Sequence, residues 1–189
     1  MARTAPVPDV RARFAAGAPG RRPLTRAAVG GLAAHVFFEL GAGVGMPLAS
    51  VVGPYPAATA WGLGTAAVWR AAGRPSPSAD RLLAAANGFG LAAVVAHLAG
   101  WPTRTRFGVP WLRTCEGLGP DLMRYYNPII YVSGAACLLA ILRENRTAPV
   151  ALPALMLGLA PALVAMQHAE HRRLKARARR RRAWWNRRL

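Results

Sequence analysis

The sequence predicts an all-α, polytopic transmembrane helical bundle of four to five spans, and three observations support this fold class. Of the 189 residues, 53% are hydrophobic, and the mean hydropathy is +0.20. The apolar residues occur in long runs with little alternation, which is unusual for a soluble domain. Charge is segregated as well, because 16 of the 25 Lys and Arg residues lie at or before Arg26 or after His171.

Residues 1–26 are predicted to form a disordered basic tail. The segment is rich in Pro, Ala and Arg, and it has no apolar core of the length that a secretory signal needs before Leu24. An Arg-rich start with few acids could also be an organelle transit peptide. We prefer the tail, because a basic flank recurs at the other end of the chain.

The first apolar run, residues 27–52, is about 26 residues long. This exceeds the roughly 20 residues that cross a bilayer, so we expect this span to tilt or bend. Gly41 and Gly45 form a GxxxG pair, which predicts a seam where another helix backbone approaches closely. The other predicted spans are 57–72, 82–100, 127–142 and 149–167.

Particular residues indicate how these spans begin, pack and bend. In span 82–100 the small residues Ala86, Gly90 and Ala93 lead at helical spacing to His97, which predicts a second packing seam. Asn127 precedes Pro128 and is interpreted as a helix cap, with Tyr125 and Tyr126 as an aromatic collar at the membrane surface. Prolines within residues 149–167 are expected to bend the last span.

Residues 101–126 are predicted to be a partly helical loop at the membrane interface, because aromatic residues alternate there with four arginines. The loop carries Glu116 and Asp121. Each carboxylate is most simply paired with an arginine. The functional alternative is that the loop caps the bundle and brings Glu116 over a cavity lined by Glu39.

Residues 169–189 are predicted to be a basic C-terminal tail, with Trp184 and Trp185 as an interfacial foot. The expected partners of the two tails are anionic lipid headgroups, with a membrane protein or a second copy of the chain as a further possible partner. No nucleic-acid partner is predicted, since the basic residues flank hydrophobic runs. His168 and His171 are interpreted as part of a solvated, basic helix end.

Charge counting leaves the topology open. The segments before, between and after the five runs hold 6, 0, 3, 4, 2 and 10 Lys or Arg residues. Both ends favour the cytoplasm, which an odd number of spans cannot satisfy. We favour a cytoplasmic C-terminal tail. Lys175 is the single lysine among the basic residues, and this bias towards arginine is typical of a GC-rich bacterial genome, so a bacterial inner membrane is expected.

His35 and Glu39 are the main candidate site. Four residues apart, they share one helix face, and ionisable groups within an apolar span tend to mark function. They could form a proton-handling pair, a structural hydrogen-bonded lock, or two ligands of a metal with His97 and Glu116 as further ligands. The candidate catalytic residues are His35, Glu39 and Glu116. No cofactor and no resident metal are predicted, and Cys115 and Cys137 are not expected to form a disulfide.

Residues 35–39, HVFFE, carry a resemblance to the emopamil-binding sterol isomerase type of membrane protein, which has a His and a Glu at this spacing in an early span. The resemblance covers these five residues.

Three classes of function follow from the sequence. The first expectation is a non-catalytic membrane accessory or scaffold protein that binds partners and lipid. The second is a membrane-embedded enzyme acting on a lipid or isoprenoid-like substrate, with Glu39 and His35 as acid and base. The third is a small transporter subunit.

Overall fold

The computed structural model describes residues 22–189, so residues 1–21 of the predicted tail lie outside the described residues. The elements in chain order are α2 (Pro23–Ala42), α3 (Ala49–Val52), α4 (Pro54–Ala71), α5 (Pro77–Gly100), β1 (Thr103–Arg106), β2 (Val109–Leu112), α6 (Pro120–Arg143), α7 (Ala151–Leu157), α8 (Ala160–Arg180) and the 3-10 turn η1 (Trp184–Asn186). The described chain is mostly helical, as predicted, and α2 begins within the segment that we assigned to the tail.

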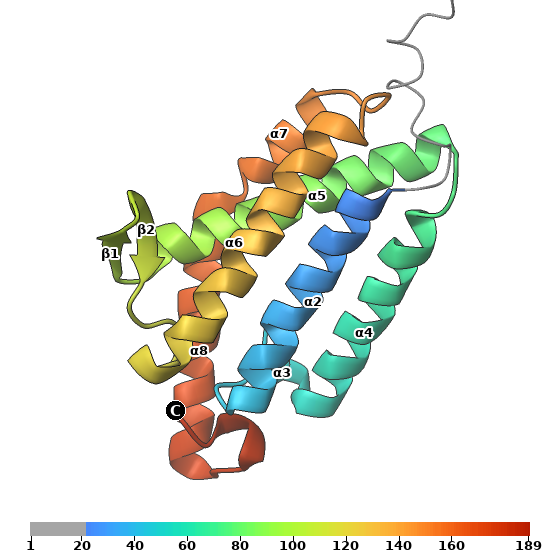
Figure 1. The fold of residues 1–189 in the computed structure, drawn as a ribbon. Coiled ribbons are helices and arrows are strands. Elements are labelled where there is room, and N and C mark those ends of the chain that lie inside the picture. Colours follow the sequence, from blue (N-terminus) through green and yellow to red (C-terminus); the bar gives the residue numbers. More distant parts are fainter. Residues whose placement is uncertain (1–21) are drawn as a thin grey trace, which may run out of the picture.

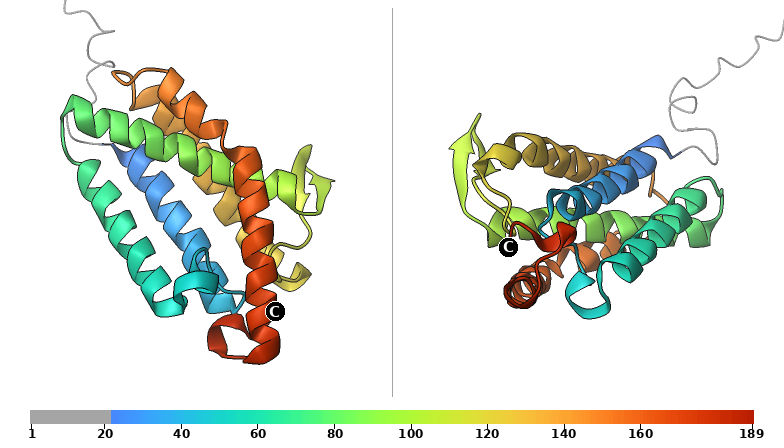
Figure 2. Two further views of the ribbon diagram at one scale, coloured as in Figure 1. Left: turned by 180° about the vertical axis from the view of Figure 1, so that it is seen from behind. Right: turned by 90° about the horizontal axis from the view of Figure 1, so that it is seen from below.

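The helices form a layered bundle. Helices α6, α2 and α4 lie side by side, α5 crosses behind them, and α7 and α8 cover the far side of α5 (Figure 1, Figure 2). Three helical segments are long and apolar enough to cross a membrane, namely Pro77–Gly100, Pro120–Arg143 and the α7–α8 segment Ala151–Arg180. The fold is therefore compatible with a membrane protein.

The predicted first span, residues 27–52, is not one helix, and the GxxxG interpretation of Gly41 and Gly45 is wrong. Helix α2 ends at Ala42 because Gly43 adopts φ 85° and its N–H donates to the carbonyls of Glu39 and Leu40. Gly45 has φ 89° and lies outside any helix, whereas a Cβ atom added at Gly41 would meet no other atom within 4 Å. Gly43 thus ends the helix, and Gly45 lies beyond it.

The predicted loop 101–126 contains a β-hairpin that we did not predict, followed by the start of α6. Strands β1 and β2 pair antiparallel with Thr103 opposite Leu112. Phe107 and Gly108 between them both have positive φ, which is the geometry of a tight two-residue hairpin turn. Trp111 of β2 stacks on Tyr131 of α6, with 5.8 Å between ring centroids, so the hairpin lies against that helix.

Helix α6 begins at Pro120, so Asn127 is not a helix cap and Tyr126 is not part of a surface collar. Asn127 is buried within the helix, where its side chain accepts from the N–H of Leu112 and donates to the Leu112 carbonyl. It therefore fixes the hairpin to α6. Tyr126 is fully buried, whereas its neighbour Tyr125 is 51% exposed.

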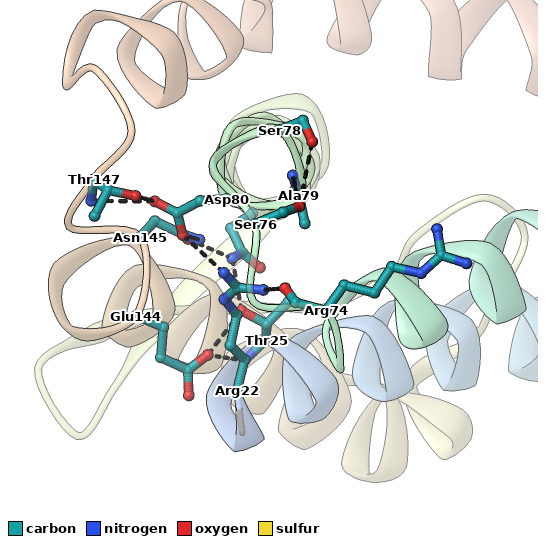
Figure 3. Close-up of polar contacts among 11 residues, drawn as sticks. Arg22, Thr25, Arg74, Ser76, Ser78, Ala79, Asp80, Glu144, Asn145 and Thr147 are labelled. Atoms are coloured by element: carbon teal, nitrogen blue, oxygen red, sulfur yellow. Dashed lines mark hydrogen bonds and ion pairs between the residues drawn. The ribbon is translucent and has the colours of Figure 1, made fainter. Parts of the chain in front are cut away.

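A buried polar network joins the helix ends near the start of α2 (Figure 3). The Glu144 carboxylate accepts from the backbone N–H groups of Leu24 and Thr25, at 2.7 and 2.8 Å. It thereby satisfies donors at the start of α2 that have no partner within the helix. Nearby, Asp80 of α5 accepts from the Asn145 amide and from the N–H and hydroxyl of Thr147. This network fixes the helix ends that surround it.

The predicted basic tail, residues 169–189, is folded against the bundle. Helix α8 continues to Arg180, and the chain then turns back beneath α2 (Figure 1). The N–H of Gly45 donates to the Trp185 carbonyl at 2.8 Å, and the N–H of Arg188 donates to the Gly43 carbonyl at 2.9 Å. Because residues 43–48 are not helical, their backbone groups are free to take these partners.

Substituting the two glycines tests the break after α2. Gly45→Ala should lower the thermal midpoint in detergent by at least about 3 °C, because alanine at this φ costs roughly 1–2 kcal/mol and its Cβ would lie 2.7 Å from Leu174. Gly41→Ala is the matched control and should leave the midpoint unchanged or raise it, since Gly41 lies in a helix with open space around it. Equal effects of the two substitutions would contradict the break.

Candidate active site

The described structure brings four ionisable residues together at one buried point. Helix α2 places His35 and Glu39 on one face, with His35 Nε2 3.0 Å from Glu39 Oε1. Helix α5 adds His97, whose Nε2 lies 3.7 Å from the same oxygen. The turn before α6 adds Glu116, with its Oε1 4.0 Å from His97 Nε2. All three candidates predicted as catalytic therefore meet, together with His97.

Tyr126 of α6 completes the surroundings of Glu39, and its hydroxyl donates to Glu39 Oε1. The side chains of His35, Glu39, His97 and Tyr126 are all buried. A carboxylate is costly in an apolar interior unless donors surround it. The hydroxyl and imidazole groups on one oxygen therefore favour an ionised Glu39.

The orientation of His97 is set by its Nδ1 atom. This atom lies 2.8 Å from the Ala93 carbonyl oxygen, which can only accept a hydrogen bond, and 2.9 Å from the Gln167 amide nitrogen, which can only donate one, so a single protonation state of Nδ1 does not satisfy both contacts. The carbonyl contact is met when Nδ1 carries the proton. Nε2 faces the carboxyl groups of Glu39 and Glu116, at 3.7 and 4.0 Å.

Glu116 stands in a strained turn. Cys115 and Leu118 pair through two backbone hydrogen bonds, and between them Glu116 and Gly117 have φ 50° and 95°. Two positive φ values define the type I′ turn, which strongly prefers Asn-Gly. A residue other than glycine that is held at positive φ, such as this glutamate, costs about 1–3 kcal/mol, and such residues tend to occur at functional sites. The turn aims the Glu116 carboxyl at His97.

The environment of Glu116 favours its neutral, protonated form. Burial and the neighbouring Glu39 carboxylate raise the pKa of Glu116 well above its usual value of 4.5. Burial and the carboxylates of Glu116 and Glu39 also raise the pKa of the Cys115 thiol well above its usual range. Cys115 is therefore not a thiolate nucleophile. The site combines one carboxyl surrounded by donors with one that keeps its proton.

A cavity of about 420 Å³ borders this cluster, which is within the usual range for small-molecule sites. Glu39, His35, His97 and Glu116 form part of its wall, and most of the remaining wall is apolar. The apolar residues come from α2, α3, α4, α5, α8 and the segment between α2 and α3, and they include Leu32, Val51, Trp61, Phe89, Leu163 and Met166. The cavity thus offers an apolar space that ends at ionisable groups.

Four buried side-chain polar atoms of residues 22–189 have no hydrogen-bond partner: Arg26 Nε, His35 Nδ1, Glu39 Oε2 and His171 Nδ1. The last three belong to residues that line this one cavity. Buried polar groups are normally paired, so unpaired atoms require an explanation. The Asp80–Glu144 network contributes no atom to this set, whereas the cavity wall contributes three of the four.

A metal ion is one possible ligand. His35, Glu39 and His97 offer ligand atoms within 4.8 Å of one another, as do His97, Cys115 and Glu116. A histidine that binds a metal nearly always donates its other ring N–H to a protein group. His97 can do so, whereas His35 Nδ1 has no partner within the described chain. The donor set therefore fits a metal only in part, and acid–base chemistry accounts for it better.

Three residues of the site were not predicted. Tyr126 and Gln167 had been assigned no role in it, and His171 had been interpreted as part of a solvated helix end. That interpretation of His171 is wrong, because α8 continues straight and turns this residue towards the cavity and the ring of Trp101, 5.3 Å away. Asp121, by contrast, pairs with Arg188 on the surface, 3.5 Å away.

Comparison with family models, with curated proteins and with solved structures finds no match for this chain. The resemblance of residues 35–39 to the emopamil-binding sterol isomerase type is therefore limited to those five residues. Function has to be argued from the side chains of the site.

Two neutral variants test the strain at Glu116. Glu116→Asn should melt about 2–4 °C above Glu116→Gln in detergent, because asparagine accepts positive φ more readily and about 1 kcal/mol of strain is relieved. Both variants lack the carboxyl group, so the difference between their melting temperatures reports the backbone strain at position 116. Equal melting temperatures would show that the turn is not strained.

The protonation of Glu116 predicts a pH dependence of stability. Above pH 4.5 the unfolded chain loses this proton while the folded protein keeps it, so the folded state loses stability as pH rises towards the raised pKa of Glu116. The thermal midpoint of the native protein should therefore fall relative to Glu116→Gln between about pH 5 and 8. Asp121→Asn, which removes an exposed carboxyl, should follow the native protein. Parallel curves for the native protein and Glu116→Gln would contradict the assignment.

Proposed function

We propose that this chain is a multi-pass protein of the bacterial cell membrane that crosses it four or five times. The three long apolar helices support this, and α2 and α4, which lie side by side with α6, are the remaining candidates (Figure 1). Ten of the 25 Lys and Arg residues follow His171, more than in any other segment between the apolar runs, which favours a cytoplasmic location of this end beside anionic lipid headgroups.

Within that membrane, we propose that the protein is an enzyme that performs acid–base chemistry on a lipid or isoprenoid-like substrate. The main support for this proposal is the position of the buried polar atoms that lack a hydrogen-bond partner. Three of the four such atoms in residues 22–189 belong to residues around one mostly apolar cavity. An apolar molecule with one polar group would fill the space and provide the absent hydrogen bonds.

Glu39 is the base in this proposal. One of its oxygens accepts from the Tyr126 hydroxyl, while Oε2 has no partner in the described structure. A carboxylate held by donors on one oxygen keeps the other free to take a proton. His35, with Nε2 3.0 Å from Oε1, holds the carboxylate in place.

Glu116 is the acid, because it lines the same cavity and keeps its proton. Two carboxyl groups whose environments separate their pKa values can act as base and acid on one substrate. His97 Nε2 lies between them, 3.7 Å from Glu39 and 4.0 Å from Glu116. After each turnover Glu39 releases its proton to water and Glu116 takes one from water, and His97 can relay protons between the two carboxyl groups. A proton leaves one atom of the substrate and another joins a second atom, so no oxidant or further reactant is needed.

The accessory or scaffold function accounts for the basic end of α8, but it gives no reason for the unpartnered atoms of the cavity. A structural lock of His35 and Glu39 would be expected to pair all its polar atoms, as the Asp80–Glu144 network does. The geometry therefore favours the enzyme among the three classes that the sequence leaves open.

Solvent deuterium exchange tests the proposal directly. The purified protein, incubated in D₂O with vesicles of total bacterial lipid, should place deuterium on a carbon atom of one lipid class, as measured by mass spectrometry. Glu39→Gln and Glu116→Gln should each slow this incorporation by at least about 100-fold, the usual contribution of a positioned acid or base. Asp121→Asn is the matched carboxyl control and should exchange at the native rate.

Thermal midpoints of all variants separate loss of chemistry from loss of folding. Slow exchange in a variant that melts near the native temperature supports the catalytic roles. No incorporation into any lipid fraction by the native protein would overturn the enzyme, as would native rates in both glutamine variants. If a chelator of divalent metals abolishes the activity of the native protein, the mechanism is metal-dependent and the acid–base mechanism is overturned.

A further inference from the structure

A second cavity of about 340 Å³ lies next to the first, between α2, α4 and α5. Its wall is almost entirely apolar, and its few polar side chains include Asn87 and Thr65. Asn87 already donates to Thr25 and Asn145, at 3.1 and 2.8 Å, so its amide nitrogen has its partners. This second space therefore suits hydrocarbon and offers little to a polar group.

The two cavities adjoin, because four residues line both of them: Leu32, Leu48, Trp61 and Phe89. Trp61 is held in place by its indole N–H, which donates to the Pro47 carbonyl at 3.2 Å. The first cavity ends at the ionisable cluster and the second has none of its members. A molecule that extends through both would thus be polar at one end and apolar along its length.

We propose that the substrate is a long-chain amphiphile whose hydrocarbon chain occupies the second cavity while its polar group faces Glu39 and His35. This inference rests on the proposed function and adds the class of substrate and its direction in the site. The occupant is one hydrocarbon chain, because the lining of the second cavity is almost entirely apolar and four of its residues also line the cavity that borders the polar cluster.

The second cavity also indicates how such a chain reaches the site. Leu48 and Phe89, on the shared wall, are 49% and 39% exposed, and Gly64 of α4 is exposed as well. In a bilayer, these surfaces contact lipid and not water. The chain can therefore pass from the membrane between α4 and α5 without crossing an aqueous phase.

Two glycines of α4 provide a matched pair for a test. Gly64 lines the second cavity, whereas Gly62 lines neither cavity, and a Cβ atom at either position would meet no other atom within 4 Å. Leucine at position 64 places four carbon atoms in the path of the chain. Leucine at position 62 makes the same chemical change on the same helix outside that path.

The experiment uses two photoreactive long-chain primary alcohols, one with its diazirine next to the hydroxyl and one with it at the chain end. Both are added to the full chain in vesicles, with unlabelled alcohol as competitor, and labelled residues are mapped by mass spectrometry. The chain-end probe should label α4 residues of the second cavity, such as Ala60 and Val68, in a way that the competitor suppresses. The head probe should label residues around Glu39.

Gly64→Leu should lose the competitor-sensitive labelling of α4 by the chain-end probe and keep the labelling by the head probe, while Gly62→Leu should label as the native protein does. If the head probe labels the cluster but the chain-end probe never reaches α4, or reaches it equally in both variants, the inference is overturned and the proposed function stands. If neither probe labels in a competitor-sensitive way, both fail.

Discussion

The buried carboxylate of Glu39 constrains the whole bundle. A charge in an apolar interior requires donors, and these come from elements far apart in the chain: the Tyr126 hydroxyl of α6, the His35 imidazole one turn earlier in α2, and His97 of α5 close by. The three helices must meet at this depth for the carboxylate to be stable. The end of α2 at Gly43, the return of the C-terminal segment beneath it and the strained turn at Glu116 all lie around this point.

The two buried polar centres of the protein differ in one respect that separates structure from chemistry. At the start of α2, Glu144 and Asp80 receive donors on both of their oxygens, which holds the helix ends together. At the other centre, Glu39 Oε2 and His35 Nδ1 have no partner in the described chain, and both residues face the apolar cavity. The first centre is therefore saturated within the described chain, whereas the second is not.

Predictions from the sequence succeeded where a local pattern of residues decides the structure. They failed where the structure depends on contacts between residues that are far apart in the chain. Long apolar runs gave mostly helical structure and three helices that can cross a membrane. The GxxxG interpretation failed because glycines also permit positive φ, and the chain uses Gly43 to end the helix before it reaches Gly45. Tyr126 and Asn127 were misassigned for a related reason. Their roles depend on Glu39 and Leu112, whose distance from them the sequence does not reveal.

The sequence alone determined the helical, apolar character of the chain, its segregated charge and the shared helix face of His35 and Glu39, because these follow from composition and from the 3.6-residue period of a helix. Only the tertiary structure decided that Glu116 and His97 join that face and that Tyr126 donates to Glu39. It also decided that His171 belongs to the cavity wall. The reason is physical, since the position of a side chain in space depends on how helices cross and turns close. The crossing of helices and the closing of turns depend on packing between residues that are far apart in the chain, and a local sequence pattern does not show which residues these are.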